Sequence, residues 1–389
     1  RYGNSLMGAQ VRVEVMTRAA VYSYPVTTFS MPTAEVWYEP VWDGTVWCAA
    51  SGTNPRVSVS SDGLNWSNVS LPYVANWSGL GTATDGAGTL LAYGRGGVVL
   101  RSVDHGQSWT IVSSPAGPYW ITKIIWDGAH FVGCTDTGNW MKSWDNGQSW
   151  VSQVPPGGVY TSYSKALTWN GSVFAAIQQF GTGSPRVWTS PSGETGSWTS
   201  RVTFGNSSNN FQYLMARNGV LVAVGTATIN SVTQGGSWVS ADNGVTWNLY
   251  PLPGGANPDS GCANATNFWF VNHQTAGYSP DGINWTTVSL NPINYGLYSI
   301  GANDTFVLFL CIAYGAAARI QRTFVTPGTE TLSSIVSAEC LNSGLLTAGD
   351  LDVSALTQTV RGYRIGTVGA IRAALEPLQA AWPFDVRQH

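Results

Sequence analysis

Ser102-Val103-Asp104-His105-Gly106-Gln107-Ser108-Trp109 is the stretch of sequence that decides the fold, because variants of it recur along the chain. An aspartate, a glycine and a tryptophan keep a nearly constant spacing, and only the fourth copy lacks the aspartate. The copies are marked by Asp62 and Trp66, Asp104 and Trp109, Asp145 and Trp150, Gly196 and Trp198, Asp242 and Trp247, and Asp281 and Trp285. The tryptophans recur about every 38 to 49 residues, a period typical of four-stranded propeller blades.

Each copy is predicted to be a tight turn between two strands. Its aspartate accepts hydrogen bonds from backbone N–H groups, its glycine takes a positive φ, and its tryptophan folds back over the turn. These aspartates are therefore predicted to be structural rather than catalytic. The copies resemble the Asp-box, or BNR, repeat of sialidase-like β-propellers, over roughly residues 36 to 325. This resemblance implies that the boxes lie on the face of the propeller away from the binding site.

A second repeat precedes each box and predicts the inner hairpin of each blade. Asp-Gly or Asn-Gly pairs, which favour two-residue hairpin turns, stand at Asp43, Asp127, Asn170 and Asn218. Looser copies near Gly86, Asn267 and Asp304 give seven hairpins against six boxes. The seventh blade therefore needs an outer strand from elsewhere, and we expect it from about residues 22–31. The predicted fold class is mainly β: a seven-bladed β-propeller with Asp-box repeats, plus a small α+β C-terminal segment.

The flanks of the propeller have a different character. Residues 327–389 are predicted to be the α+β segment, since Leu332, Ile335 and Val336 follow a helical period. Residues 1–20 are predicted to supply a strand, because Val11 and Val13 alternate with polar residues. We expect both flanks to form one domain interrupted by the propeller at residues 21–326; an unrelated disordered N-terminal tail is the alternative. The chain is expected to be a fragment of a longer protein.

Residues 330–389 resemble a segment of the tail-hub, or host-specificity, proteins of siphophages and gene transfer agents. The resemblance is carried by Asp350-Leu-Asp-Val-Ser-Ala-Leu-Thr-Gln-Thr-Val-Arg-Gly-Tyr-Arg-Ile365 and by Ala374-Leu-Glu-Pro-Leu-Gln-Ala-Ala-Trp-Pro-Phe-Asp385. It implies a component of a phage tail tip, made in the host cytoplasm and incorporated into the virion. Other tail proteins would be its partners, and a homotrimer its oligomeric state. Without this resemblance, the segment is a generic α+β fragment.

Composition excludes several classes of function. A formal net charge of -3 with 18 Lys and Arg leaves no basic surface for nucleic acid. The longest apolar run, residues 306–313, is too short for a membrane span. Five cysteines, an odd and widely spaced set, are expected to be buried free thiols. The four histidines have no ligand spacing, so we expect neither a metal nor a cofactor.

An enzymatic function is not expected. Sialidases clamp the substrate with three arginines and use a tyrosine nucleophile with a glutamate, and an aspartate as acid and base. Between Val41 and Thr326 the chain holds a single glutamate, Glu194, and it lies in the degenerate fourth box. The candidate acids that remain are Asp85, Asp127, Asp136, Asp259 and Asp304, and their spacing places no two of these carboxylates together. A glycosidase that depolymerises host surface polysaccharide is therefore only the alternative.

Aromatic side chains gather in the connections between blades, on the face opposite the boxes. Such rings suit stacking against sugars, so they are predicted to bind a host surface receptor, a glycan or a protein, without catalysis. The alternatives are that these rings fill the space between blades, or that the propeller is purely structural. The candidate binding residues are Tyr73, Trp77, Tyr119, Trp120, Tyr160, Tyr163, Tyr213, Tyr295 and Tyr298.

Overall fold

The structure is a computed structural model that describes most of the chain between residues 22 and 360. The described residues are 22–23, 26–72, 77–153, 166–178, 185–204, 209–273, 275–290, 297–311, 316–321, 323–324, 330–333, 336–337, 352–356 and 359–360. The chain divides into two compact units, Pro25–Arg322 and the combined flanks Arg1–Tyr24 and Thr323–His389.

The larger unit consists of four-stranded antiparallel sheets, numbered here in the order of their innermost strands. Sheet 1 contains β3 (Trp37–Trp42), β4 (Trp47–Ser51), β5 (Arg56–Ser60) and β6 (Ser67–Ser70). Sheet 2 contains β7 (Gly79–Thr84), β8 (Leu90–Gly94), β9 (Val99–Ser102) and β10 (Thr110–Val112). Sheet 3 contains β11 (Ile121–Trp126), β12 (Phe131–Thr135), β13 (Trp140–Ser143) and β14 (Val151–Gln153). Sheet 4 contains β15 (Leu167–Trp169), β16 (Phe174–Gln178), β17 (Arg186–Ser190) and β18 (Thr199–Thr203).

Three further sheets continue the series. Sheet 5 contains β19 (Asn210–Arg217), β20 (Val220–Ile229), β21 (Val232–Ser240) and β22 (Asn248–Pro251). Sheet 6 contains β23 (Ser260–Ala263), β24 (Phe268–Asn272), β25 (Thr275–Ser279) and β26 (Thr286–Ser289). Sheet 7 contains β27 (Leu297–Ala302), β28 (Phe306–Cys311), β29 (Ala316–Gln321) and β2 (Val26–Ser30). Two 3-10 turns, η1 (Arg95–Gly97) and η2 (Pro253–Gly255), lie in connections.

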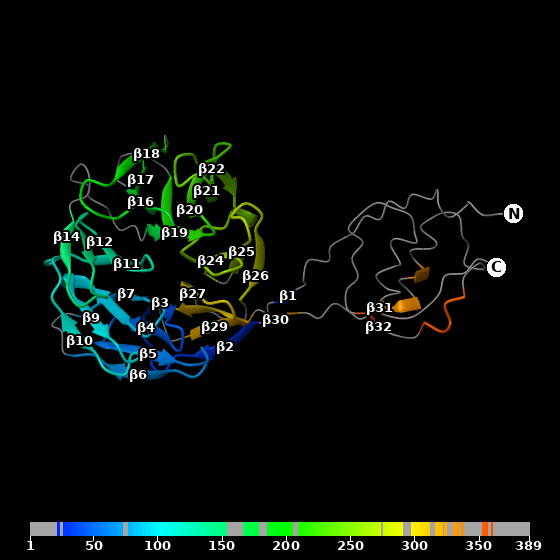
Figure 1. Ribbon diagram of the computed structural model, residues 1–389, viewed down its shortest axis with the longest axis horizontal. Helices are drawn as coiled ribbons and strands as arrows, with labels where there is room; N and C mark the ends of the chain where they lie inside the picture. The colour runs from blue at the N-terminus through cyan, green and yellow to red at the C-terminus, as the bar shows by residue number, and fades with distance from the viewer. Residues whose placement is uncertain are drawn as a thin grey trace. The chain divides into compact units, whose positions relative to one another are not determined.

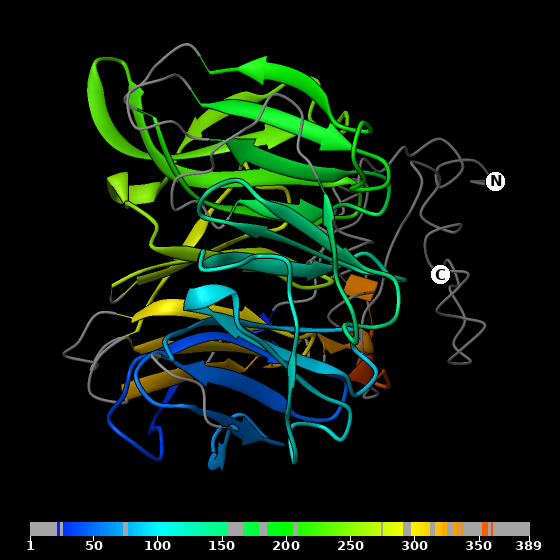
Figure 2. The same cartoon turned by 90° about the vertical axis from the view of Figure 1, so that its left-hand side faces the viewer.

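The sheets follow one another around a common centre, as Figure 1 shows for the larger unit. Each innermost strand packs against the next, in the order β3, β7, β11, β15, β19, β23 and β27, and β27 packs against β3 again. The outer strand of sheet 7 is β2, which comes from the segment where the sequence predicts a closing strand and pairs with β29. The prediction of a mainly β propeller is confirmed. In the side view of Figure 2, the long β20–β21 hairpin extends from sheet 5.

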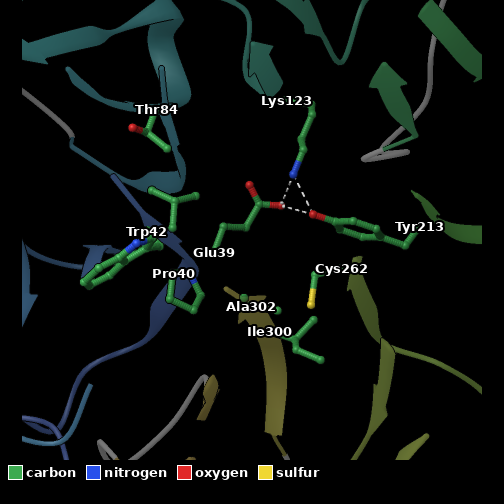
Figure 3. Close-up of a pocket in the computed structure, with 11 residues that line it drawn as sticks. Glu39, Pro40, Trp42, Thr84, Lys123, Tyr213, Cys262, Ile300 and Ala302 are labelled. Atoms are coloured by element: carbon green, nitrogen blue, oxygen red, sulfur yellow. Dashed lines mark hydrogen bonds and ion pairs between the residues drawn. The ribbon is translucent and has the colours of Figure 1, made fainter. Parts of the chain in front are cut away.

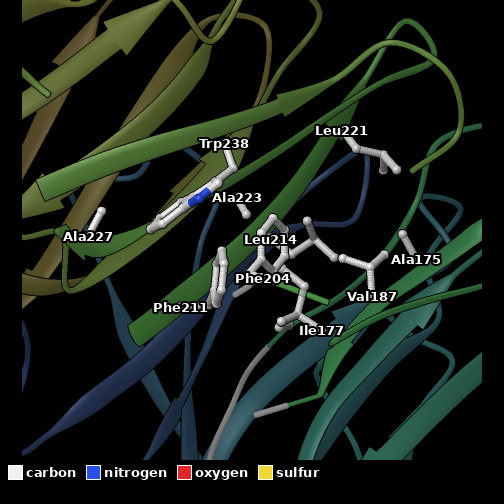
Figure 4. Close-up of a cluster of buried hydrophobic side chains, with 11 residues drawn as sticks. Ala175, Ile177, Val187, Phe204, Phe211, Leu214, Leu221, Ala223, Ala227 and Trp238 are labelled. Carbon is white, nitrogen blue, oxygen red and sulfur yellow. The ribbon is translucent and has the colours of Figure 1, made fainter. Parts of the chain in front are cut away.

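The cores lie between neighbouring sheets. Between sheets 4 and 5, the ring of Phe211 packs against Phe204 and Trp238, with centroid distances of 4.8 and 4.3 Å (Figure 4). Tilted aromatic pairs of this kind contribute roughly 0.5–1.5 kcal/mol each beyond the area they bury. Aliphatic side chains from both sheets, such as Ile177 and Leu214, fill the rest of this cluster. Packing between sheets, rather than pairing between strands of one sheet, therefore joins neighbours in the ring.

Several innermost strands contain a β-bulge near their start, and these bulges set which side chains point to the centre of the ring. The pairing register shifts between Tyr38 and Val41 in β3, and in β7, β11, β19 and β27 just before Gly81, Lys123, Tyr213 and Ser299. A bulge adds one unpaired residue and re-aims the neighbouring side chains. Residues that follow the bulges in different sheets consequently face one another across the centre.

The smaller unit is described only in part. Its described strands are β1 (Tyr22–Ser23) with β30 (Thr323–Phe324), and β31 (Glu330–Thr331) with β32 (Thr359–Val360). Leu332 and Val336 are helical and buried. Most of the predicted α+β segment at 327–389, and all of the predicted N-terminal strand at 1–20, lie outside the described residues. The predicted boundaries between domains stay predictions.

Candidate functional site

The Asp-boxes form the turns that the sequence pattern predicts. In the second box, Asp104 Oδ1 accepts hydrogen bonds from the backbone N–H groups of Gln107 (3.1 Å) and Ser108 (2.9 Å). Gly106 has a φ of 79°, which a residue with a Cβ adopts only with strain. Trp109 Nε1–H donates to the carbonyl of Gly106 (3.0 Å), so the indole lies over the turn. The same indole bond holds the turns of boxes five and six, at Trp247 and Trp285.

Hydrogen bonds keep the box carboxylates ionised. Partial burial acts to raise the pKa of Asp104, but the hydroxyl and backbone N–H groups around it outweigh burial and lower the pKa to about 2. The same balance lowers the pKa of Asp62 and of Asp281 to about 2. It also lowers the pKa of Asp145 and of Asp242. A carboxyl that stays ionised near neutral pH is a poor general acid, so these residues serve the turns.

Box residues also link neighbouring sheets, a role that the sequence analysis missed. The residue after the box aspartate has a positive φ in three boxes, and its side chain reaches the hairpin turn of the preceding sheet. The three pairs are His105 Nδ1 with Asp43 Oδ2 (2.8 Å), Asn146 Nδ2 with Asp85 Oδ2 (2.9 Å) and Asn170 Nδ2 with Asn243 Oδ1 (2.7 Å). Hairpin turns and boxes therefore share one face of the propeller, which we call the turn face.

In the fourth box, a glutamine and a lysine from the neighbouring sheet stand in for the missing aspartate, the glutamine as acceptor and the lysine as donor to the turn. Lys142 Nζ donates to the carbonyl of Ser192 (2.7 Å) and lies 3.1 Å from Glu194 Oε1. Gln153 Oε1 accepts from the backbone N–H of Thr195 (2.9 Å), as the aspartate does elsewhere. The lysine side chain is only 3% exposed. Glu194 thus has a structural partner on the turn face, where the sequence analysis placed it.

The candidate aromatic residues do not form one described surface. Trp77 is buried between sheets 1 and 2, and its Nε1–H donates to the carbonyl of Ser51 (2.9 Å). Trp120 stacks under the Arg95 guanidinium at 3.9 Å, and Tyr119 is 41% exposed. Tyr213 is buried at the centre of the ring. The remaining candidates fall outside the described residues, or, for Tyr298, have a described backbone only: Tyr73, Tyr160, Tyr163, Tyr295 and Tyr298.

A pocket of about 260 Å³ lies at the centre, among the innermost strands (Figure 3). Its lining runs from the middle of β3 to the strand ends that lead into the hairpin turns, so it lies toward the turn face. The aromatic candidates were predicted for the opposite face. The lining residues are Glu39, Pro40, Val41, Trp42, Thr84, Lys123, Tyr213, Cys262, Ile300, Gly301 and Ala302.

Glu39 is the organising residue of this pocket. Its side chain is only 4% exposed, and Oε1 lies 3.3 Å from Lys123 Nζ. Tyr93 donates its hydroxyl to Oε2 at 2.7 Å, and Lys123 donates to the Tyr213 hydroxyl oxygen at 2.5 Å. The Glu39 backbone N–H donates to Ser299 Oγ at 2.6 Å. The Glu39 carboxylate therefore connects sheet 1 with sheets 2, 3 and 5, and the Glu39 backbone N–H adds a link to sheet 7. Figure 3 shows the contacts with Lys123 and Tyr213.

The backbone accommodates this arrangement at a cost. Glu39 has a φ of 40°, in a region that residues other than glycine seldom occupy and that costs of order 1–3 kcal/mol. Gly81 supplies the space: a Cβ there would meet the Glu39 carboxylate and lie 2.5 Å from the Tyr93 hydroxyl oxygen. Such a backbone conformation persists only where contacts with the surrounding structure hold it in place. Strain of this kind often marks a functional site.

Electrostatics keep the tyrosines of the cluster neutral. Burial, and then the negative charge of Glu39, raise the pKa of Tyr93 and of Tyr213 well above the ordinary value. Both residues therefore remain phenols that can donate hydrogen bonds, rather than nucleophilic phenolates. Burial likewise raises the pKa of the Cys262 thiol, although the nearby charge of Lys123 opposes this. Of the described free cysteines, Cys48 and Cys134 are buried and Cys262 is partly exposed, which agrees with the expectation of free thiols.

The sequence analysis named Tyr213 but missed Glu39 and Lys123. A charged residue in the apolar segment Trp37-Tyr-Glu-Pro-Val-Trp42 was the available signal, since charges are seldom buried without a partner. Among the described residues, no group of three or more His, Cys, Asp or Glu is placed to hold a metal. Within the same residues, no helix has both the length and the apolar character to cross a membrane.

Comparisons with known proteins point away from a virion. No protein-family model matches the chain. Over 104 residues it is 31% identical to the photosystem II assembly lipoprotein Ycf48 of Synechococcus sp. (strain CC9605), which covers 26% of the chain and 31% of that relative. The chain thus matches about a third of the length of this curated relative.

Solved structures share the fold. A Ycf48 structure with a bound D1 peptide is 18% identical, with a TM-score of 0.60, over 78% of this chain and 98% of that one. A catalytically inactive histidine-to-alanine variant of virginiamycin B lyase from Staphylococcus aureus, with quinupristin, is 12% identical, with a TM-score of 0.58. That match covers 77% of this chain and 99% of the lyase. At these identities the likeness establishes the propeller fold alone.

The prediction of a phage tail-hub protein is wrong, because the curated protein that matches the chain is a Ycf48 protein, and so is one of the solved structures that share its fold. The predicted virion location, tail-protein partners and homotrimer were implied by that resemblance and are corrected with it. The host glycan or protein receptor, predicted from the aromatic rings, is corrected as well, because the similar Ycf48 structure holds a D1 peptide. The glycosidase alternative is not supported either, since the two tyrosines beside Glu39, Tyr93 and Tyr213, are both held as neutral phenols. Asp-boxes stabilise turns in propellers of many functions, so they carried no information about this one.

Proposed function

We propose that the propeller is a non-catalytic assembly factor of the Ycf48 kind, which binds a peptide segment of a protein partner. The observation that carries this proposal is the 31% identity to a photosystem II assembly lipoprotein. The Ycf48 structure with a bound D1 peptide supports the same mode of action, because it matches this propeller over 98% of its own length. D1, or a protein segment like it, is accordingly the partner we propose.

The central pocket supports binding rather than catalysis. Its carboxylate and its ammonium are engaged with each other and with two neutral phenols, so neither is poised to move a proton. In the lyase, loss of a histidine accompanies loss of activity, as the description of the inactive variant states. The described histidines of this chain, His105, His130 and His273, are not among the residues that line the pocket.

We also infer that each four-stranded sheet is one blade, which makes the ring seven-bladed. The closed order of the innermost strands and the pairing of β2 with β29 support this count. In this proposal, residues 327–389 add a small α+β segment to the propeller. The grouping of Arg1–Tyr24 with Thr323–His389 supports the idea that the flanks belong together.

Peptide binding is testable with the purified chain. Overlapping synthetic peptides that span D1 would be labelled with fluorescein and titrated with the protein, with a scrambled peptide of equal composition as the control. We expect saturable anisotropy for at least one D1 peptide and none for its scrambled form. Absence of saturable binding across the whole set would contradict the proposal.

A lyase is the second candidate, because the fold likeness to virginiamycin B lyase is close to the likeness to Ycf48. Incubation of the protein with quinupristin, followed by liquid chromatography, tests it directly. We expect the quinupristin peak to remain unchanged over hours. Its conversion to a product by the wild-type chain would favour the lyase instead.

A further inference from the structure

The central pocket is too small for an extended ligand. Its volume of about 260 Å³ is below the ~300–1,000 Å³ of most small-molecule sites. A peptide therefore cannot lie inside it, but one side chain of a peptide that crosses the turn face can enter. The pocket is reached from that face, because Trp42, Thr84 and Ala302 stand where their strands run into the hairpin turns.

The charges inside the pocket already compensate each other. Lys123 and Glu39 form an ion pair, and Tyr213 is neutral. An incoming charged side chain would have to break this pair or be buried without a partner, and both are costly. An uncharged side chain avoids that cost. The walls near the turn face, formed by Pro40, Trp42, Ile300 and Ala302, favour an apolar one.

One polar contact remains for the ligand. An ammonium has three N–H donors, and Lys123 directs two of them at Glu39 and Tyr213. The third has no acceptor among the described residues. A peptide carbonyl is a neutral acceptor and could take it without disturbing the ion pair.

We propose that this pocket is the anchor site for one uncharged, apolar side chain of the partner peptide, whose carbonyl accepts a hydrogen bond from Lys123. The proposal rests on the peptide-binding function proposed above. It adds the place of binding, the class of side chain that is selected, and the residue that fixes its backbone.

Cys262 provides a built-in reporter for the test, since it lines the pocket and is partly exposed. The probes are N-acetyl-leucinamide and N-acetyl-phenylalaninamide, with the corresponding derivatives of glutamate and lysine for comparison. Each is added at about 20 mM, because so few atoms can give only about millimolar affinity. The rate of Cys262 labelling by N-ethylmaleimide is then followed by peptide mass spectrometry at pH 8.5 in all samples, because burial raises the pKa of this thiol and the thiolate is the form that reacts.

We expect the two apolar probes to slow the labelling of Cys262 at least about threefold, in line with millimolar affinity at this concentration, and the charged probes to leave it unchanged. A leucine side chain in A302L should fill the pocket and abolish protection. A129L makes the same change in an exposed turn residue outside the pocket, and should keep protection. The comparison of probes on the wild-type chain needs no variant, so misfolding of A302L would not remove the test.

Equal protection by charged probes, or protection by none, would overturn the proposal. Its failure can be distinguished from failure of the proposed function. If D1 peptides bind while the apolar probes give no protection, the peptide is held elsewhere and the pocket assignment is wrong. If the probes protect Cys262 while D1 peptides do not bind, the pocket stands and the choice of partner is wrong.

Discussion

Replacement of Lys123 by methionine tests the role of the ion pair at the centre of the ring. The change keeps most of the apolar length of the side chain but leaves Glu39, whose side chain is 4% exposed, without the ammonium at 3.3 Å. Coulomb's law at an effective dielectric constant of about 20 gives roughly 5 kcal/mol for this separation. Removal of one partner of a buried pair costs about 3–5 kcal/mol, because the other charge stays buried. We therefore expect the free energy of unfolding to fall by about 3 kcal/mol or more.

Urea unfolding at pH 7, followed by circular dichroism, measures this change. Glu39→Gln and the double variant Glu39→Gln/Lys123→Met complete a double-mutant cycle. The double variant holds no unpaired charge, so we expect it to recover about 2 kcal/mol relative to the sum of the two single changes. A coupling energy below about 0.5 kcal/mol would refute the view that Glu39 and Lys123 stabilise each other in the folded chain.

Four further substitutions probe other parts of the structure. Gly81→Ala places a methyl group against the Glu39 carboxylate, and calorimetry should detect a loss of about 1–3 kcal/mol from overpacking. Lys142→Met should lower the free energy of unfolding by about 1–3 kcal/mol, since it leaves the Ser192 carbonyl in the fourth box without its donor. Glu194→Gln should lower it by under about 0.5 kcal/mol, because the Glu194 side chain is 45% exposed. Equal losses in urea unfolding would argue against Lys142 as the residue that holds this turn. Asp62→Asn should cost about 1 kcal/mol at pH 7 after solvent screening. The pKa of Asp62 in the folded chain, about 2, is below its value in the unfolded chain. The extra stability of the wild type should therefore persist above pH 4 and vanish as the pH falls to 2. Acid titration of both proteins, followed by circular dichroism, checks this.

Local features of the fold were predictable because each is encoded within a few consecutive residues. The box at Asp104 specifies its turn through an acceptor, a glycine with positive φ and a tryptophan that covers both. The strand that closes sheet 7 was also predictable, since six boxes against seven hairpins required a strand from outside the repeats. The functional prediction was wrong because it followed the resemblance of the C-terminal flank to tail-hub proteins. It rested on residues 330–389, and few of these are among the described ones.

The central site could not be predicted, because its members are far apart in the sequence and meet only when the ring closes. Glu39 and Lys123 are separated by 84 residues, and Glu39 and Tyr213 by 174. Each follows or occupies a bulge, and a one-residue bulge re-aims a side chain in a way that alternation of apolar and polar residues does not reveal. Trp77 illustrates the converse. Its place between two blades suggested a binding surface, but the indole is buried among side chains of sheets 1 and 2.

Stability and binding can be separated in this molecule by position. The boxes and hairpin turns hold neighbouring sheets together at the outer part of the turn face, through pairs such as His105 with Asp43. Glu39, Lys123 and Tyr213, by contrast, join sheets that are not neighbours. A substitution in a box should therefore lower stability without changing peptide affinity, because it loosens one turn and leaves the pocket lining in place. A substitution at Glu39 should lower both, since the same carboxylate holds opposite sides of the ring and sets the charge balance that the pocket offers to a ligand.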